Sequence, residues 1–90
     1  MVEVEVTCRE TFRSSKGKTV TVTAVIREGR VVEARLTGDF FVSDDSLFER
    51  LEATLSGRDC EGLKSLRLPR VLIGADEGEV VRALLRCLNC

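Results

Sequence analysis

Hydrophobic and polar residues alternate along the first third of the chain. The alternating runs cover residues 2–13, residues 19–27 and the stretch between Gly29 and Gly38. The residues predicted to face inward are Val2, Val4, Val6, Cys8, Val20, Val22, Ala24, Ile26, Val32, Ala34 and Leu36. A period of two is typical of a strand with one buried face. A polar turn separates the first two runs and Glu28-Gly29 separates the last two, which predicts three antiparallel strands.

After Phe41 the hydrophobic period changes to that of a helix. The apolar stripe consists of Leu47, Phe48, Leu51 and Leu55. Such a stripe covers one side of a helix and packs on a core. Ser43 is the predicted N-cap, and Gly57 is predicted to follow the helix in a left-handed conformation.

Two further helical segments follow. A short helix is predicted to begin at Asp59 and to end before Pro69. Asp76 is predicted to cap the last helix, with Glu79 completing a capping box. The apolar stripe of this helix consists of Val80, Val81, Leu84, Leu85 and Leu88. Residues 71–73 form an apolar run too short to assign by its period.

The order of these elements predicts the fold class. Three strands come first and helices follow, which is typical of an α+β fold in which a three-stranded antiparallel sheet has helices packed on one face. This is a two-layer sandwich. No linker or repeat divides the chain, so residues 1–90 are predicted to form a single domain.

Composition narrows the classes of function. The chain is 43% hydrophobic and 32% charged, which excludes a disordered polymer. A formal net charge of −1 gives no global reason to expect binding to nucleic acid or to a membrane surface. The apolar runs are far shorter than a bilayer span, and the first residues do not resemble a signal peptide. We therefore expect a cytoplasmic protein with no nucleic-acid partner and no membrane partner.

The chain contains no His, Trp, Tyr or Gln, and its one Asn is Asn89. Without histidine, a Ser-His-Asp triad and a histidine-based metal site are both excluded. Abundant charged residues with few amides resemble the composition of a thermophile's proteins. No catalytic constellation is predicted.

The C-terminal Cys87-Leu88-Asn89-Cys90 is a C-x-x-C motif. Such a pair can bind a metal, form a redox dithiol or close a local disulfide. A closed zinc site needs four ligands, but Cys8 and Cys60 form no second C-x-x-C, and the motif lies at the wrong end of a helix to stabilise a thiolate. We therefore predict incidental thiols and no metal at Cys87 and Cys90. Structural disulfides are the alternative, with three full pairings open.

The junction between the third strand and the first helix contains Gly38, Asp39, Phe40 and Phe41. Asp39 is predicted to accept hydrogen bonds from backbone N–H groups of the following loop. Both phenylalanines are predicted to be core residues. Residues 14–18 carry two lysines but lack the P-loop spacing, so a solvated turn is predicted there.

Arginines are a feature of the predicted hairpin. Arg27, Arg30 and Arg35 are predicted to line its exposed side. A partner surface could use these guanidinium groups.

The order of motifs from Gly29 to Gly57 resembles the C-terminal accessory domain of lipoate–protein ligases. In that family a G-x-I hairpin leads to an I-x-G-D-F-F corner, and a helix carrying L-E-x-x-L-x-G follows. Here the matching segments are Leu36-Thr37-Gly38-Asp39-Phe40-Phe41, then Leu51-Glu52 and Leu55-Ser56-Gly57. The resemblance covers most of the chain. Residues 60–75 diverge from it, and the C-terminal cysteine pair is not part of the pattern.

The resemblance implies a non-catalytic small subunit of a two-chain lipoate–protein ligase. The large subunit of such an enzyme would hold ATP and lipoate, form lipoyl-AMP and pass the lipoyl group to an acceptor protein. This chain would bind no cofactor alone and would show no activity alone. Its expected partners are the large subunit, which the corner Gly38–Phe41 would contact, and lipoyl-acceptor proteins. The fold would resemble sulfur-transfer and iron–sulfur scaffold domains. The alternative is a sulfur, iron–sulfur or metal-handling scaffold that uses Cys87 and Cys90.

Overall fold

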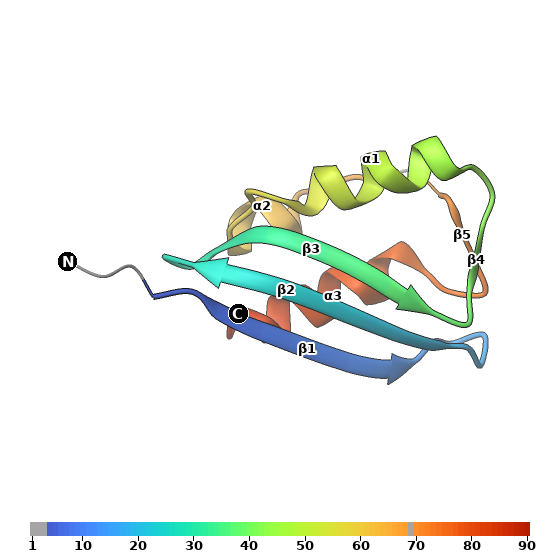
Figure 1. Ribbon diagram of the computed structural model, residues 1–90, viewed down its shortest axis with the longest axis horizontal. Helices are drawn as coiled ribbons and strands as arrows, with labels where there is room; N and C mark the ends of the chain where they lie inside the picture. The colour runs from blue at the N-terminus through green and yellow to red at the C-terminus, as the bar shows by residue number, and fades with distance from the viewer. Residues whose placement is uncertain (1–3, 69) are drawn as a thin grey trace.

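A computed structural model describes residues 4–68 and 70–90 of the chain. Its main sheet has the order β1-β2-β3, and both pairings are antiparallel. The elements in chain order are β1 (Val6–Arg13), β2 (Thr19–Arg27), β3 (Arg30–Gly38), β4 (Phe41–Val42), α1 (Asp45–Leu55), α2 (Cys60–Lys64), β5 (Leu72–Ile73) and α3 (Glu77–Cys87). The three-stranded sheet followed by helices confirms the predicted α+β class (Figure 1).

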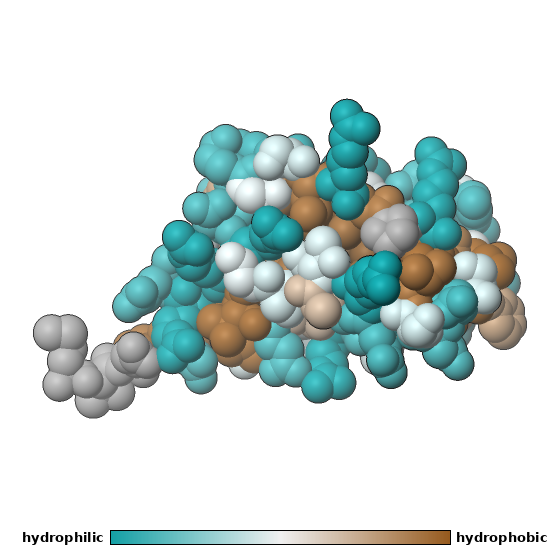
Figure 2. Space-filling model, turned by 90° about the horizontal axis from the view of Figure 1, so that it is seen from above, coloured by the Kyte–Doolittle hydropathy of each residue, from teal (hydrophilic) through white to brown (hydrophobic). Residues whose placement is uncertain are grey.

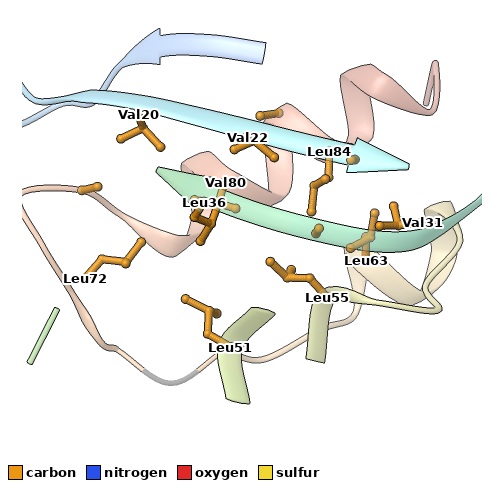
Figure 3. Packing of buried hydrophobic residues seen from close by; sticks show 14 residues of the cluster. Val20, Val22, Val31, Leu36, Leu51, Leu55, Leu63, Leu72, Val80 and Leu84 are labelled. Carbon is orange, nitrogen blue, oxygen red and sulfur yellow. The ribbon is translucent and has the colours of Figure 1, made fainter. Parts of the chain in front are cut away.

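One face of the sheet carries the hydrophobic core. Strand residues of β2 and β3 point toward α1 and α3, whose apolar stripes close over them (Figure 3). The fully buried large side chains are Val20, Val22, Val31, Leu51, Leu55, Leu63, Val71, Val80 and Leu84. Burying a Val or Leu side chain contributes roughly 1.5–3 kcal/mol each, so this face holds the two layers together.

The inward face of β3 begins one residue earlier than the alternation predicts. Ile26 pairs with Val31 while Val25 pairs with Glu33, so Val32 is the extra residue of a β-bulge. A bulge shifts which residues face the core on its two sides. Val31 is therefore buried and Val32 is exposed, and the prediction that Val32 faces inward is wrong.

The first strand is shorter than predicted. Val2 and Glu3 lie outside the described residues, and β1 starts at Val6. Val4 and Val6 are exposed although the alternation predicts them inward. The reason is that α3, which would cover them, ends at Cys87 beside Cys8.

The N-cap of α1 is Asp44 rather than the predicted Ser43. The Asp44 carboxylate accepts hydrogen bonds from the backbone N–H groups of Ser46 and Leu47, at 2.9 and 3.1 Å. A carboxylate there satisfies two helix N–H groups and interacts favourably with the helix dipole. Gly57 follows the C-cap with φ +79, which confirms its predicted left-handed conformation.

The caps of the other helices agree with the sequence in part. The short helix α2 starts where predicted, with Asp59 as its N-cap. Asp76 caps α3 as predicted, by accepting from the Gly78 N–H at 2.7 Å. The predicted capping box of Glu79 is wrong, because its carboxylate accepts from the backbone N–H of Ser15 at 3.0 Å. Pro69, the predicted end of the short helix, lies outside the described residues.

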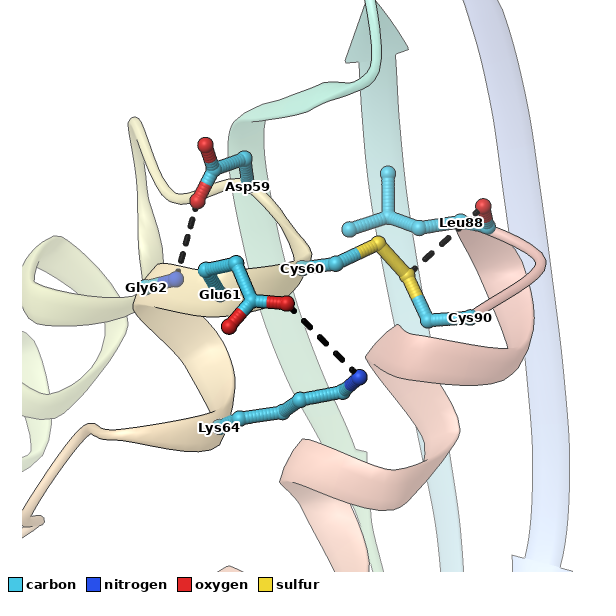
Figure 4. The surroundings of a disulfide bond; sticks show 7 residues. All are labelled: Asp59, Cys60, Glu61, Gly62, Lys64, Leu88 and Cys90. Atoms are coloured by element: carbon cyan, nitrogen blue, oxygen red, sulfur yellow. Dashed lines mark hydrogen bonds and ion pairs between the residues drawn. A yellow bond between two sulfur atoms is a disulfide. The ribbon is translucent and has the colours of Figure 1, made fainter.

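Two disulfides join the C-terminal residues to the rest of the fold. Cys87 is bonded to Cys8 of β1, and the Cα atoms lie 5.9 Å apart. Cys90 is bonded to Cys60 of α2, with a Cα separation of 6.2 Å (Figure 4). The prediction of incidental thiols is therefore wrong, and the disulfide alternative is confirmed with one of its three pairings.

Candidate interaction site at the corner after β3

The chain leaves the main sheet at Gly38, where only glycine fits. Gly38 pairs with Val20, and a Cβ atom on it would collide with the backbone carbonyl of Thr19. The backbone N–H of Asp39 then donates to that same Thr19 carbonyl at 3.0 Å. The direction in which the chain enters β4 is thus fixed by the backbone of β2.

The two phenylalanines after this turn have different environments. The ring of Phe40 packs against the core and lies 6.1 Å from that of Phe48 of α1, with the ring planes inclined at 43°. Such tilted aromatic pairs are favourable. Phe41 instead has 70% of its surface exposed. The prediction of a core position is wrong for Phe41, because neighbouring residues of an extended chain face opposite ways and only one side of β4 is covered.

Phe41 lies beside a second exposed apolar residue. It pairs across the β4–β5 ribbon with Ile73, which is 54% exposed. We call Phe41 and Ile73 the corner patch. Apolar surface reaches the end of the molecule opposite the N-terminus in Figure 2, where Figure 1 places β4 and β5. The two side chains form a small exposed apolar surface at this end of the fold.

The ribbon that presents the corner patch is anchored by polar contacts. The Glu77 carboxylate accepts from the backbone N–H groups of Val71 and Leu72 at 2.7 and 3.1 Å. The buried Ser14 hydroxyl donates to the carbonyl of Gly74 at 2.6 Å. The prediction that residues 14–18 form a merely solvated turn is therefore wrong for Ser14. These contacts fix the backbone on both sides of Ile73.

Asp39 does not make the contacts predicted for it. Its side chain is exposed and accepts no hydrogen bond from the described part of the chain. The backbone N–H groups of Asp39 and Ser43 donate instead to the carbonyls of Thr19 and Val71, and Asp44 caps the helix that follows. Hydrogen bonds from the Ser46 hydroxyl and from the N–H groups of Leu47 and Ser46 hold the pKa of the Asp44 carboxyl below its ordinary value. Asp39 is left as a free carboxylate near the corner patch.

The structure separates the two predicted groups of site residues. Gly38, Asp39, Phe40 and Phe41 lie together at one end of the sheet, whereas Cys87 and Cys90 lie toward the other end (Figure 1). Each of these two cysteines is bonded to a different distant cysteine. Within residues 4–68 and 70–90, no group of three or more His, Cys, Asp or Glu side chains is placed to hold a metal ion.

Three residues of the corner carried no clear sequence signal. Ile73 lies in the apolar run 71–73, whose short length left its side unassigned. Ser14 and Glu77 resemble ordinary turn and helix-start residues, and only the folded chain brings them to the ribbon.

Comparison with protein-family models, with curated proteins and with solved structures found no match. In the described ranges, every helix is too short or too polar to cross a membrane.

Proposed function

We propose that this protein is the non-catalytic small subunit of a two-chain lipoate–protein ligase and that it contacts the large subunit through the corner patch. The observation that carries the proposal is the exposure of Phe41 next to Ile73, in the same corner on which the family resemblance rests. Large aromatic residues that are rigidly presented are typical anchors of protein interfaces. The polar anchoring of β5 keeps the patch in place before a partner arrives.

The chemistry follows from what a small subunit can add. The large subunit would hold ATP and lipoate, and this chain would help to close that site. Closure excludes water and holds the reacting groups in attacking geometry, and the site must reopen to admit the acceptor protein. The proposal includes a cytoplasmic location. Intracellular disulfides are compatible with that location in hyperthermophiles.

The experiment is a mixing assay with the candidate large subunit, lipoate and ATP, scored for lipoyl-adenylate. We expect adenylate to form only when this chain is present. Phe41→Ser should lower adenylate formation about tenfold or more at limiting subunit concentration, because an interface anchor is lost. Asp39→Asn should have a smaller effect, since this change keeps the size of an exposed side chain and removes only its charge.

The matched control is Val6→Ser, which removes a strand residue 56% exposed at the opposite end of the molecule. This variant should support adenylation as well as the unmodified chain. Thermal unfolding of each variant alone separates a lost contact from a lost fold. Equal adenylation with and without this chain contradicts the proposed function. Equal loss in both variants contradicts the assignment of the interface.

The alternative from the sequence, a sulfur or iron–sulfur scaffold using Cys87 and Cys90, gains no supporting observation. Each cysteine is bonded to its own distant partner, so the pair is not a free dithiol in this fold. Changing both to serine tests the alternative directly. The ligase proposal predicts that the folded double variant still supports adenylation.

A further inference from the structure

The face of the sheet that points away from the helices carries a cluster of arginine and threonine. Val20, Val22 and Ala24 of β2 are buried on the opposite face, so the intervening threonines of β2 point outward. The same alternation places arginines of the edge strands outward. Charged strand residues on this outer face are Arg9, Arg13, Arg27, Arg30 and Arg35 against Glu33, and Arg27 also pairs with Glu5. A chain with a net charge of −1 therefore has one locally basic face.

The strand register arranges these side chains in two rows. Arg9 pairs with Thr23, and Thr23 pairs with Arg35, so two arginines flank a central threonine. The neighbouring row consists of Thr11, Thr21 and Thr37. Two strand spacings separate the Cα atoms of the flanking arginines by roughly 10 Å. Both long side chains can therefore reach a group placed over Thr23.

These six residues line an open concavity of about 490 Å³, the size of a site for a small molecule. Its floor holds hydroxyl groups, and two of them, on Thr11 and Thr21, lie 3.1 Å apart within hydrogen-bond distance. Among the described residues, no carboxylate and no aromatic ring belongs to its lining. The groups that converge there are cationic or hydroxyl hydrogen-bond donors.

The two arginines differ in how they are held. The Nε of Arg35 donates to Glu33 at 2.8 Å, which orients its guanidinium and leaves the terminal nitrogens available. Arg9 forms no ion pair with any part of the chain that the structure describes. An unpaired guanidinium next to hydroxyl donors is a good match for a tetrahedral oxyanion, because its fork can donate two parallel hydrogen bonds.

We propose that the concavity formed by Arg9, Thr23 and Arg35 binds a phosphate group of a small ligand. Arginine and threonine donors around an open concavity of this size favour a small phosphorylated molecule over an extended acidic protein surface. A lining of arginine and threonine gives no platform for stacked bases and disfavours single-stranded nucleic acid. This site is separate from the corner patch, so it does not depend on the proposed function.

The test is an NMR titration of the full chain with inorganic pyrophosphate at constant ionic strength. We expect saturable shifts of the backbone amides of Arg9, Thr23 and Arg35. Arg9→Gln should weaken pyrophosphate binding about tenfold, because a charge-assisted contact is lost. Arg9→Lys should recover part of the affinity, since it keeps the charge and loses the fork. Thr23→Val removes only the central hydroxyl and should weaken binding several-fold.

The matched control is Arg50→Gln, which removes the same charge from the exposed surface of α1. It should leave pyrophosphate affinity unchanged. Absent or non-saturating shifts, or an equal loss in Arg50→Gln, overturn the proposal. Tighter binding of a polyglutamate peptide than of pyrophosphate also overturns it and assigns the face to an acidic protein. ATP and tripolyphosphate titrated side by side distinguish a nucleotide from a free polyphosphate as the source of the phosphate group.

Discussion

The two ends of this molecule are held together in different ways. At the end that carries the C-terminus, two disulfides join α3 and the last residue to β1 and α2. At the other end, the β4–β5 ribbon is held by hydrogen bonds from Glu77 and Ser14 (Figure 1). Phe41, an aromatic residue with most of its surface exposed, lies at this hydrogen-bonded end.

This contrast indicates where function is to be sought. A disulfide constrains the unfolded chain and so stabilises the whole domain. It does this without presenting any side chain to a partner. A ribbon that is anchored by polar contacts while exposing apolar side chains has little reason to do so for stability alone. We therefore assign the covalent end to stability, and the corner patch is the surface that we propose for the partner.

The largest expected change in the free energy of unfolding comes from removing a disulfide at the end that carries the C-terminus. The Cys8–Cys87 bond closes a sequence separation of 79 residues. Replacing both cysteines by serine should lower the free energy of unfolding by about 4.5 kcal/mol in the chain-entropy description. The shorter Cys60–Cys90 closure should contribute about 3.7 kcal/mol by the same relation. Denaturant unfolding of the two serine double variants measures the two contributions separately, and unfolding under reductant measures their sum. An unchanged midpoint under reduction contradicts the assignment of this end to stability.

The next largest change in stability is expected from Gly38, where the chain leaves the main sheet. Gly38→Ala should lower the free energy of unfolding by about 2–4 kcal/mol, because the new Cβ meets the carbonyl of Thr19 and the backbone is strained. The matched control is Gly17→Ala in the β1–β2 turn, where φ is +82 and no atom lies within 4 Å. That change should cost only about 1 kcal/mol from backbone conformation. Equal losses in the two variants indicate that close approach at Gly38 is unimportant.

The smallest effect concerns the cap that begins the helix after the corner. Asp44→Ala should destabilise the domain slightly at neutral pH, since two backbone N–H groups lose their acceptor. The pKa of Asp44 is below its ordinary value of 3.8 in the folded state. A depressed folded pKa stabilises the fold above the unfolded pKa, and this stabilisation is lost as the pH falls through the folded pKa.

The measurement for Asp44 is the difference in thermal midpoint between the unmodified chain and Asp44→Ala. It should be largest near neutral pH and should shrink below pH 3.8 as the carboxyl becomes protonated. Ser43→Ala is the control, because Ser43 is not the cap. A midpoint difference that does not change with pH would mean that the Asp44 side chain stabilises the helix start equally well in its charged and neutral forms.

Local patterns in the sequence are enough to define the elements that repeat with a regular period. The alternation of β2 and the stripes of the two long helices depend only on residues close together in the chain, so their buried faces can be predicted from the pattern alone. The capping roles of Asp59 and Asp76 are equally local, since a cap contacts N–H groups within three residues. The α+β class followed from the order of the elements.

Features that join distant residues are set by the tertiary fold. The bulge turns Val32 outward, although the alternation predicts it inward, because the partner strand sets the register. The disulfide pairing, the anchoring of β5 by Glu77 and Ser14, and the separate environments of Phe40 and Phe41 all depend on which surfaces meet. Such contacts leave no period in the sequence, because their partners lie far apart along the chain and are chosen by packing.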